Sequence, residues 1–211
     1  MTLSSRPKVS LCASIAAFSV SAALSCAAIS QQETPKSTSQ QTSQATRYFP
    51  VGAVGSFAKF FAEYLRFFDE PSLLPRAEDR TVVSYRLESL LLRGHEVLVV
   101  RLSLNPDGTA RVVTVDQSGK PPAVHRIERT SPAADVKKFL ELIEKVNFWS
   151  TSTLRQDTGY TRDGVPWIFE GLLDGKYHVV IRDDWPSNRS DELLRYITID
   201  LGKVDASGIP R

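Results

Sequence analysis

The pair Asp174-Gly175, which lies between two apolar segments, constrains the fold of this 211-residue chain more than any other feature. Asp-Gly in such a setting is the strongest short-range signal for a β-hairpin, because both residues tolerate the positive φ angles of a tight two-residue turn. Such a turn fixes the register, so that Leu173 faces Lys176. The sequence therefore predicts antiparallel strands over Trp167–Leu173 and Lys176–Arg182.

The predicted register places alternate side chains of the hairpin on two faces. One face groups Trp167, Phe169, His178, Val180 and Arg182. The other face is apolar apart from one carboxylate and contains Ile168, Glu170, Leu172, Tyr177, Val179 and Ile181. Because Gly171 opposes His178 and has no side chain, we expect a gap in which the imidazole lies against the backbone, near the aromatic residues.

Glu170 and His178 are the candidate catalytic residues. A carboxylate on an apolar face is costly unless it is paired, and burial shifts its pKa toward the range that acid–base catalysis requires. The structural alternative, which we favour, is an ion pair between Glu170 and an Arg or Lys of a helix, with His178 bonded to a backbone carbonyl. Trp167 and Arg182 are the candidate binding residues, and Arg182 suits an anionic group.

Two helices and four strands are predicted before the hairpin. An aromatic stripe with helical spacing, which we expect to be core, is formed by Phe57, Phe60, Phe61, Tyr64, Leu65 and Phe68, with Ser56 as N-cap. The strands are expected over residues 82–87, 95–104, 110–115 and 123–129, with a turn at Asn105-Pro106-Asp107-Gly108. Ser131-Pro132 is expected to begin the second helix, with Ser131 as N-cap.

A third helix is predicted after Ser190, which would cap it, and Gly202 would end it. The order is then helix, four strands, helix, two strands, helix. Strands joined by short turns pair antiparallel. We therefore predict an α+β domain over residues 47–211, with an antiparallel sheet of about six strands, a meander plus a hairpin, and three helices packed mainly on one face.

The first 28 residues have the three parts of a secretory signal peptide. Arg6 and Lys8 form a basic start, residues 11–24 are apolar, and small residues follow at 25–28. The apolar part is shorter than the roughly 20 residues of a spanning helix, so we favour a cleaved signal over an uncleaved anchor. Residues 29–46 are polar and are expected to form a disordered tether. The sequence therefore predicts an exported bacterial protein, periplasmic or secreted.

Cys26 offers an alternative to plain secretion, in which the exported protein is lipidated on this residue. The segment Ala23-Leu24-Ser25-Cys26 resembles the box that lipoprotein signal peptidase reads, although Leu is more usual at the place of Ala23. Acyl chains on Cys26 would anchor the protein to the envelope membrane. Cleavage after Ala27 or Ala28 competes with this reading, and we favour plain secretion.

Charge and residue types argue against several classes of function. Arg6 and Lys8 are two of the 26 Lys and Arg residues, so 24 remain in the mature chain against 24 Asp and Glu. A neutral domain lacks the basic surface that binds nucleic acid. The only cysteines, Cys12 and Cys26, lie in the leader, which leaves the domain without a thiol nucleophile. The chain also contains no P-loop and no G-x-S-x-G elbow, and we expect no cofactor.

Metal binding would have to rely on three histidines, His95, His125 and His178. His95 and His125 lie on different predicted strands and could meet across the sheet. Two histidines without a carboxylate pattern fall short of the ligand set of a zinc site. We therefore expect no metal.

The hairpin region resembles a pattern, DGxxWxxEG…GxYHVVxR, of uncharacterised bacterial proteins that are often predicted to be exported. The matching residues are Asp163–Gly171 (DGVPWIFEG) and Gly175–Arg182 (GKYHVVIR), and Glu70-Pro71-Ser72-Leu73 is similar as well. No activity is assigned to that family, so the resemblance implies export and a shared hairpin but no reaction.

These observations favour a non-catalytic exported domain that binds an envelope or extracellular protein. No complete catalytic set is present, and nucleic acid is not an expected partner. Membrane contact would occur only through a lipid on Cys26, in which case the protein has a structural role in the envelope. The alternative is a small hydrolase-type enzyme that uses Glu170 and His178.

Overall fold

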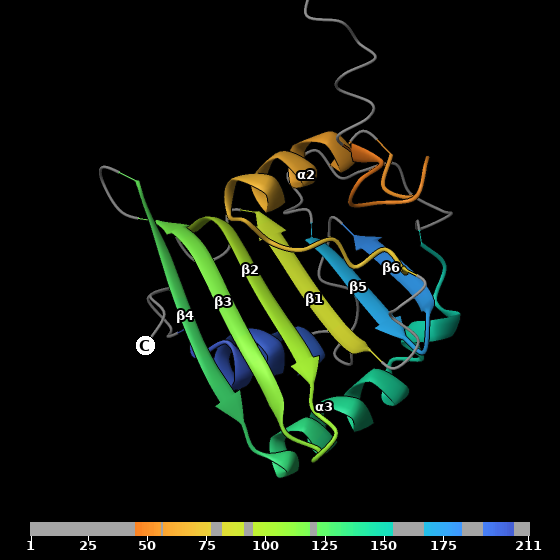
Figure 1. The fold of residues 1–211 in the computed structure, drawn as a ribbon, viewed down its shortest axis with the longest axis vertical. Helices are drawn as coiled ribbons and strands as arrows, with labels where there is room; N and C mark the ends of the chain where they lie inside the picture. The colour runs from red at the N-terminus through yellow and green to blue at the C-terminus, as the bar shows by residue number, and fades with distance from the viewer. Residues whose placement is uncertain are drawn as a thin grey trace, which may run out of the picture. The chain divides into compact units, whose positions relative to one another are not determined.

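A six-stranded antiparallel sheet with strand order β4-β3-β2-β1-β5-β6 forms the centre of the computed structural model (Figure 1). Its strands are β1 (Val83–Leu90), β2 (His95–Leu104), β3 (Ala110–Ser118), β4 (Ala123–Ser131), β5 (Trp167–Leu173) and β6 (Lys176–Arg182). The first four strands form the predicted meander, and the hairpin joins the sheet on the free side of β1. The predicted α+β class and the antiparallel sheet are confirmed.

The structure describes residues 45–55, 57–76, 82–90, 95–118, 122–153, 167–182 and 192–204. All of them lie in one compact unit, Lys36–Arg211. The predicted signal peptide, the tether up to residue 44, Cys26 and the caps Ser56 and Ser190 lie outside the described residues. Within the described ranges, no helix has the length and apolar character needed to cross a membrane.

The register of the β5–β6 hairpin agrees with the prediction. Leu173 pairs with Lys176, and Trp167 pairs with Arg182. Both turn residues have positive φ, 49° for Asp174 and 75° for Gly175, as a tight two-residue turn requires. The Asp-Gly pair therefore decides which hairpin side chains share a face.

Replacing Gly175 with alanine tests this turn. A Cβ at residue 175 would meet no atom within 4 Å, so only the backbone conformation opposes the change. We expect Gly175→Ala to lower the free energy of unfolding by about 1 kcal/mol, because an L-residue is strained at positive φ. Urea unfolding followed by circular dichroism measures this loss. The exposed Lys176→Ala variant is the control, and equal stability of the two variants would contradict the turn geometry.

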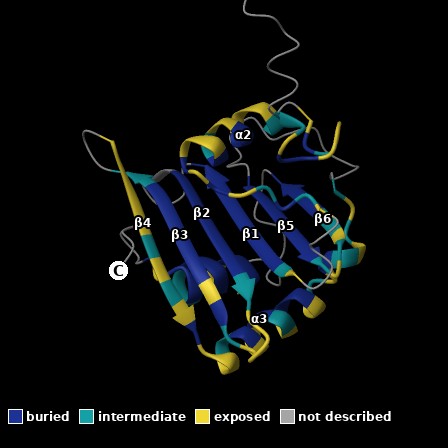
Figure 2. Cartoon of the chain, in the orientation of Figure 1, coloured by how far each residue is buried: buried dark blue, intermediate teal, exposed yellow. Residues whose placement is uncertain are grey.

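The two faces of the sheet carry separate apolar cores with different helices. Helix α2 (Phe57–Phe67) and residues 48–54 pack on one face. On the other face lie α3 (Ala133–Lys145), η3 (Phe148–Ser150) and the C-terminal helix that ends in η4 (Tyr196–Leu201). We expected the helices mainly on one face, but α2 lies opposite to the other two. The four central strands are buried on both sides, whereas the edge strand β4 is largely exposed (Figure 2).

The aromatic stripe of α2 is only partly core, which corrects the prediction. Phe61, Leu65 and Phe68 are buried, but Phe60 is 39% exposed. A helix that packs on a sheet by one side buries a limited arc, and Phe60 lies at the margin of that arc. Spacing alone does not show how wide the covered arc is.

The last helix changes geometry before it ends. Residues 192–195 are α-helical, and η4 continues as a π-helix whose last hydrogen bond runs from Gly202 N to Ile197 O. A Cβ at Gly202 would lie 2.5 Å from the carbonyl oxygen of Thr198, so only glycine fits this close approach. Helix α3 also differs slightly from expectation, since Ser131 is the last residue of β4 and Pro132 occupies the N-cap.

Candidate functional site

Glu170 lies on the α2 face of the sheet and is fully buried. Arg86 of β1, its cross-strand neighbour, contacts the Glu170 Oε2 with Nη2 at 2.5 Å and donates to it from Nε at 2.6 Å. The hydroxyl of Tyr177 donates to Oε1 of Glu170 at 2.7 Å. The predicted ion pair exists, but its cation comes from the adjacent strand and not from a helix.

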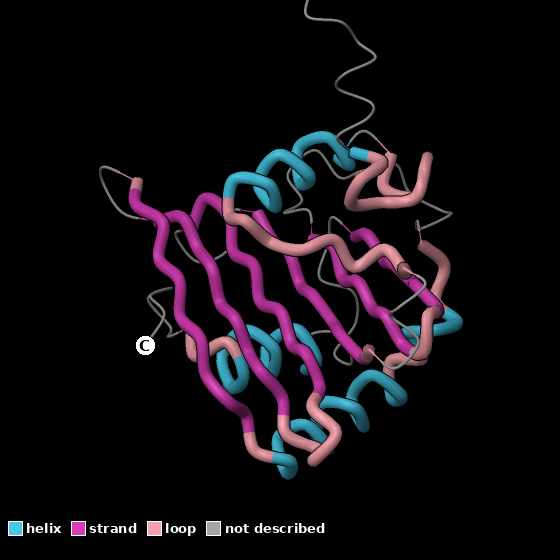
Figure 3. The backbone as a smooth tube through the Cα atoms, viewed as in Figure 1, coloured by secondary structure: helices cyan, strands magenta, loops and turns pink. Residues whose placement is uncertain are grey.

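This pair is part of a larger group of charges, the ionic layer, formed by Glu70, Arg86, Glu88, Arg101, Arg126 and Glu170. Glu70 accepts from Arg101 at 2.7 Å and from Arg126 at 2.9 Å. Arg86 also donates to the carbonyl oxygen of Pro71 at 2.6 Å. The segment after α2, which crosses the strands in Figure 3, covers this layer and supplies both Glu70 and the Pro71 carbonyl. Every buried charged residue of the ionic layer therefore has an oppositely charged neighbour.

Sequence reasoning did not find the ionic layer as a unit. In β1, polar residues alternate with apolar ones, a pattern typical of a strand with one solvent face. Here the polar side is buried, because the chain after α2 covers it. Alternation has the same form whether the polar side faces solvent or a covering segment, so the sequence gives no signal for this layer.

Burial and neighbouring charges move the pKa values in this layer. Burial lowers the pKa of Arg86, but the attraction of Glu170 and Glu88 outweighs it, so the pKa is raised overall. Burial raises the pKa of Glu88 well above its ordinary value; the attraction of Arg86 opposes the rise, and the Glu170 carboxylate adds to it. Burial and the Glu170 charge raise the pKa of Tyr177, which keeps its hydroxyl a donor. Glu88 is thus the carboxyl group of the layer that favours the neutral form.

The titration of Glu88 gives a pH-dependent prediction. A carboxyl group whose pKa is raised by folding stabilises the protein at low pH and loses this contribution as the pH rises toward its folded-state pKa. We expect Glu88→Gln to match the native protein near pH 4.5 and to exceed its stability at pH 7, by about 1.4 kcal/mol for each unit by which folding raises the pKa. Urea unfolding at several pH values measures the difference. A less stable variant at pH 7 would contradict a neutral Glu88.

His178 lies on the opposite face from Glu170. Its imidazole ring packs edge-on against the ring of Phe148, with 4.9 Å between the ring centroids. Burial lowers the pKa of the imidazole. The expected gap at Gly171 is filled, because a Cβ there would lie 2.7 Å from Phe148 Cε1. Glu170 and His178 therefore do not form one acid–base pair on a common substrate.

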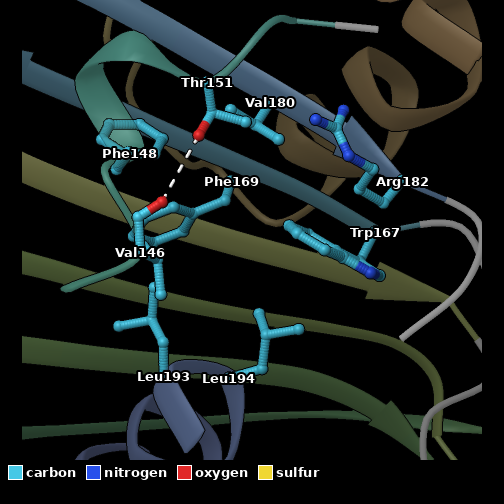
Figure 4. Close-up of a pocket in the computed structure, with 9 residues that line it drawn as sticks. All are labelled: Val146, Phe148, Thr151, Trp167, Phe169, Val180, Arg182, Leu193 and Leu194. Atoms are coloured by element: carbon cyan, nitrogen blue, oxygen red, sulfur yellow. Dashed lines mark hydrogen bonds between the residues drawn. The ribbon is translucent and has the colours of Figure 1, made fainter. Parts of the chain in front are cut away.

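Trp167 and Arg182, the two candidate binding residues, line the same pocket (Figure 4). Its volume is about 50 Å³, and its walls come from the end of α3, from η3, from both hairpin strands and from the C-terminal helix. The nine lining residues are Val146, Phe148, Thr151, Trp167, Phe169, Val180, Arg182, Leu193 and Leu194. Most of the wall is aliphatic or aromatic, so the pocket favours an apolar group.

The polar groups at this pocket are tied to the backbone. The hydroxyl of Thr151 donates to the carbonyl oxygen of Asn147 at 3.0 Å. Arg182 donates to the carbonyl oxygens of Ser152 at 3.0 Å and Thr153 at 3.1 Å. These bonds hold the 151–153 segment against β6, where Ile181 N also donates to Thr153 O at 2.9 Å. The rim of the pocket is therefore fixed by hydrogen bonds before any ligand arrives.

Sequence reasoning found two of the nine lining residues as candidates. Val146, Leu193 and Leu194 have the spacing of apolar helical stripes, which indicates burial but not a pocket. An apolar stripe that packs against a sheet has the same spacing whether or not a space is left between them. No signal in the sequence distinguishes the two cases.

The remaining histidine candidates are not brought together. His125 lies on β4 opposite Asp116, and its side chain is exposed. His95 lies on β2, and its backbone pairs with Ser118 of β3. Strand β3 therefore lies between His95 and His125, and the side chain of His95 is outside the described residues. Within the described ranges, no three His, Cys, Asp or Glu side chains are placed to hold a metal ion together.

The sequence matches no known protein-family model and no curated protein.

Proposed function

We propose that this chain is an exported, non-catalytic binding domain, and that the pocket beside Trp167 and Arg182 holds a small aliphatic group of its partner. The observation that carries the proposal is an apolar pocket whose walls come from both hairpin strands and from three helical segments (Figure 4). Separate elements that leave a space between them, with a rim fixed by hydrogen bonds, form a preorganised site.

The size of the pocket limits what enters it. A cavity of about 150 Å³ holds benzene, and this pocket is about a third as large. A methyl or isopropyl group fits such a space, whereas an aromatic ring does not. We therefore propose an envelope or extracellular protein that inserts an aliphatic side chain. The leader at residues 1–28 supports a partner in the periplasm or outside the cell, and a lipid on Cys26 would place that partner at the envelope membrane.

Two measurements test this function. Xenon occupies apolar cavities, so we expect methyl signals of Val180, Leu193 and Leu194 to shift in a xenon titration followed by NMR. Val146→Phe places a ring where the pocket lies and should abolish these shifts. Val51→Phe adds the same ring at a residue that is 86% exposed and serves as the matched control.

The same variants test partner binding. We expect the native protein and Val51→Phe to enrich one protein from envelope extract, and Val146→Phe to enrich at least about tenfold less of it, since the anchoring group no longer fits. Near-native thermal unfolding of Val146→Phe checks its fold. Equal enrichment by all three proteins, or no xenon shift in the native one, would refute the proposed site.

A further inference from the structure

A second cavity lies on the opposite face of the sheet, beside the ionic layer. Its volume is about 210 Å³, and it is lined by Pro71, Ser72, Leu73, Arg76, Val82, Ser84, Arg101, Ser103 and Leu172. Five of these nine residues carry a hydroxyl or a guanidinium group, in contrast to the apolar pocket at Trp167. The chemistry of this wall is that of a site for a polar ligand.

Arg101 is the central residue of this wall. Only 8% of its side chain is exposed, and its Nε and Nη1 donate to Glu70 and Ser103. Among the described residues, Nη2 of Arg101 donates no hydrogen bond. A buried guanidinium with donors left over beside a cavity can bind an oxygen of an anion.

The serine hydroxyls hold this guanidinium in place. Ser84 Oγ donates to the carbonyl oxygen of Leu102 at 2.8 Å and lies 3.1 Å from Ser103 Oγ. Ser103 Oγ in turn accepts from Arg101 Nη1 at 3.1 Å. Three neighbouring residues of β1 and β2 thus fix the orientation of the Arg101 guanidinium, which limits its freedom to turn away from the cavity.

The charge of the ionic layer favours an anion. Its three cations are Arg86, Arg101 and Arg126, and its carboxyl groups are Glu70, Glu88 and Glu170. Because burial raises the pKa of Glu88, that group favours its neutral form, which leaves the six residues of the ionic layer with three cations against two carboxylates. An anion in the cavity offsets this excess.

We propose that this cavity binds a small oxyanion, a phosphate or carboxylate group, against the Nη2 of Arg101. The site is separate from the proposed partner pocket, which lies on the other face of the sheet. Its ligand class is anionic, whereas that of the pocket is aliphatic.

Ser72 offers a matched pair of variants for the test. Its Oγ accepts a hydrogen bond from Leu74 N at 3.1 Å, and an Asp or Asn side chain can make the same local bond. Ser72→Asp adds a negative charge to the cavity wall, and Ser72→Asn adds a side chain of the same shape without charge. Any difference between the two variants therefore reports electrostatics and not local structure.

The experiment is an NMR titration of the purified protein with inorganic phosphate and, separately, with acetate, at constant ionic strength. We expect saturable shifts of the amides of Leu73, Arg101 and Ser103 with at least one of these anions. We expect Ser72→Asp to weaken binding at least about tenfold and Ser72→Asn to change it by less than about threefold. The absence of saturable shifts with both anions, or equal weakening in the two variants, would overturn the proposal. The xenon experiment is unaffected by either result.

Discussion

Arg86→Met is expected to lower the free energy of unfolding by about 3–5 kcal/mol, the cost of leaving a buried charge without its partner. Arg86 is fully buried and neutralises Glu170, which is also fully buried. It also satisfies the Pro71 carbonyl, so its loss affects the segment that covers the sheet. Urea unfolding followed by tryptophan fluorescence measures the change.

Arg111→Met is the matched control for this prediction. Arg111 forms a two-bond ion pair with Glu128, and both side chains are about half exposed. Exposed pairs of this kind contribute little to stability, because water and salt screen their attraction. If Arg86→Met destabilises the protein no more than Arg111→Met does, the ionic layer does not stabilise the fold. In the double variant Arg86→Met/Glu170→Leu, we expect part of the loss to be recovered, since no unpaired carboxylate remains.

Gly171→Ala is expected to cost about 1–3 kcal/mol through overpacking. The added Cβ would lie 2.7 Å from Phe148 Cε1 and 3.1 Å from Trp149 Cη2, so the η3 turn has to shift. The change also moves the wall of the apolar pocket, because Phe148 belongs to it. Unfolding by urea and the xenon-induced methyl shifts report the two effects separately.

A double-mutant cycle assigns this cost to the named contact. Phe148→Leu removes the ring that blocks the space above Gly171, and Gly171→Ala should then cost at least about 1 kcal/mol less than in the native background. Additive effects of the two changes would show that the strain arises elsewhere. No further control is needed, because the cost of Gly171→Ala is measured both in the native protein and in Phe148→Leu, and the two values are compared.

The parts of the fold that local rules decide could be predicted from the sequence. The Asp174-Gly175 turn fixed both strands of the hairpin and their register, and the pairing of Trp167 with Arg182 follows from it. The boundaries of β2 agree as well, since Asn105-Pro106-Asp107-Gly108 closes a turn in which Gly108 N donates to Asn105 O. These features depend on residues that are close together in the sequence, so the sequence alone is sufficient to predict them.

The parts that depend on distant segments could not be predicted in the same way. Which face α2 covers is decided by the path of residues 68–76, and no spacing in α2 specifies it. The cation that pairs with Glu170 is Arg86, 84 residues earlier in the chain. The space at Gly171 is occupied by Phe148, which arrives from the end of α3. To predict any of these contacts, one has to know how the strands and helices are arranged in the sheet, and a single sequence does not reveal this arrangement.

The two edge strands of the sheet are β4 and β6, and each is protected from pairing with another molecule in a different way. A sheet edge presents unpaired N–H and C=O groups that can recruit a strand from another molecule. At the β6 edge, the Thr153 carbonyl already occupies the N–H of Ile181. At the β4 edge, an incoming strand meets the charged side chains of Arg126, Glu128 and Arg129. Both borders of the sheet therefore discourage edge-to-edge aggregation, one through an occupied backbone donor and the other through charge.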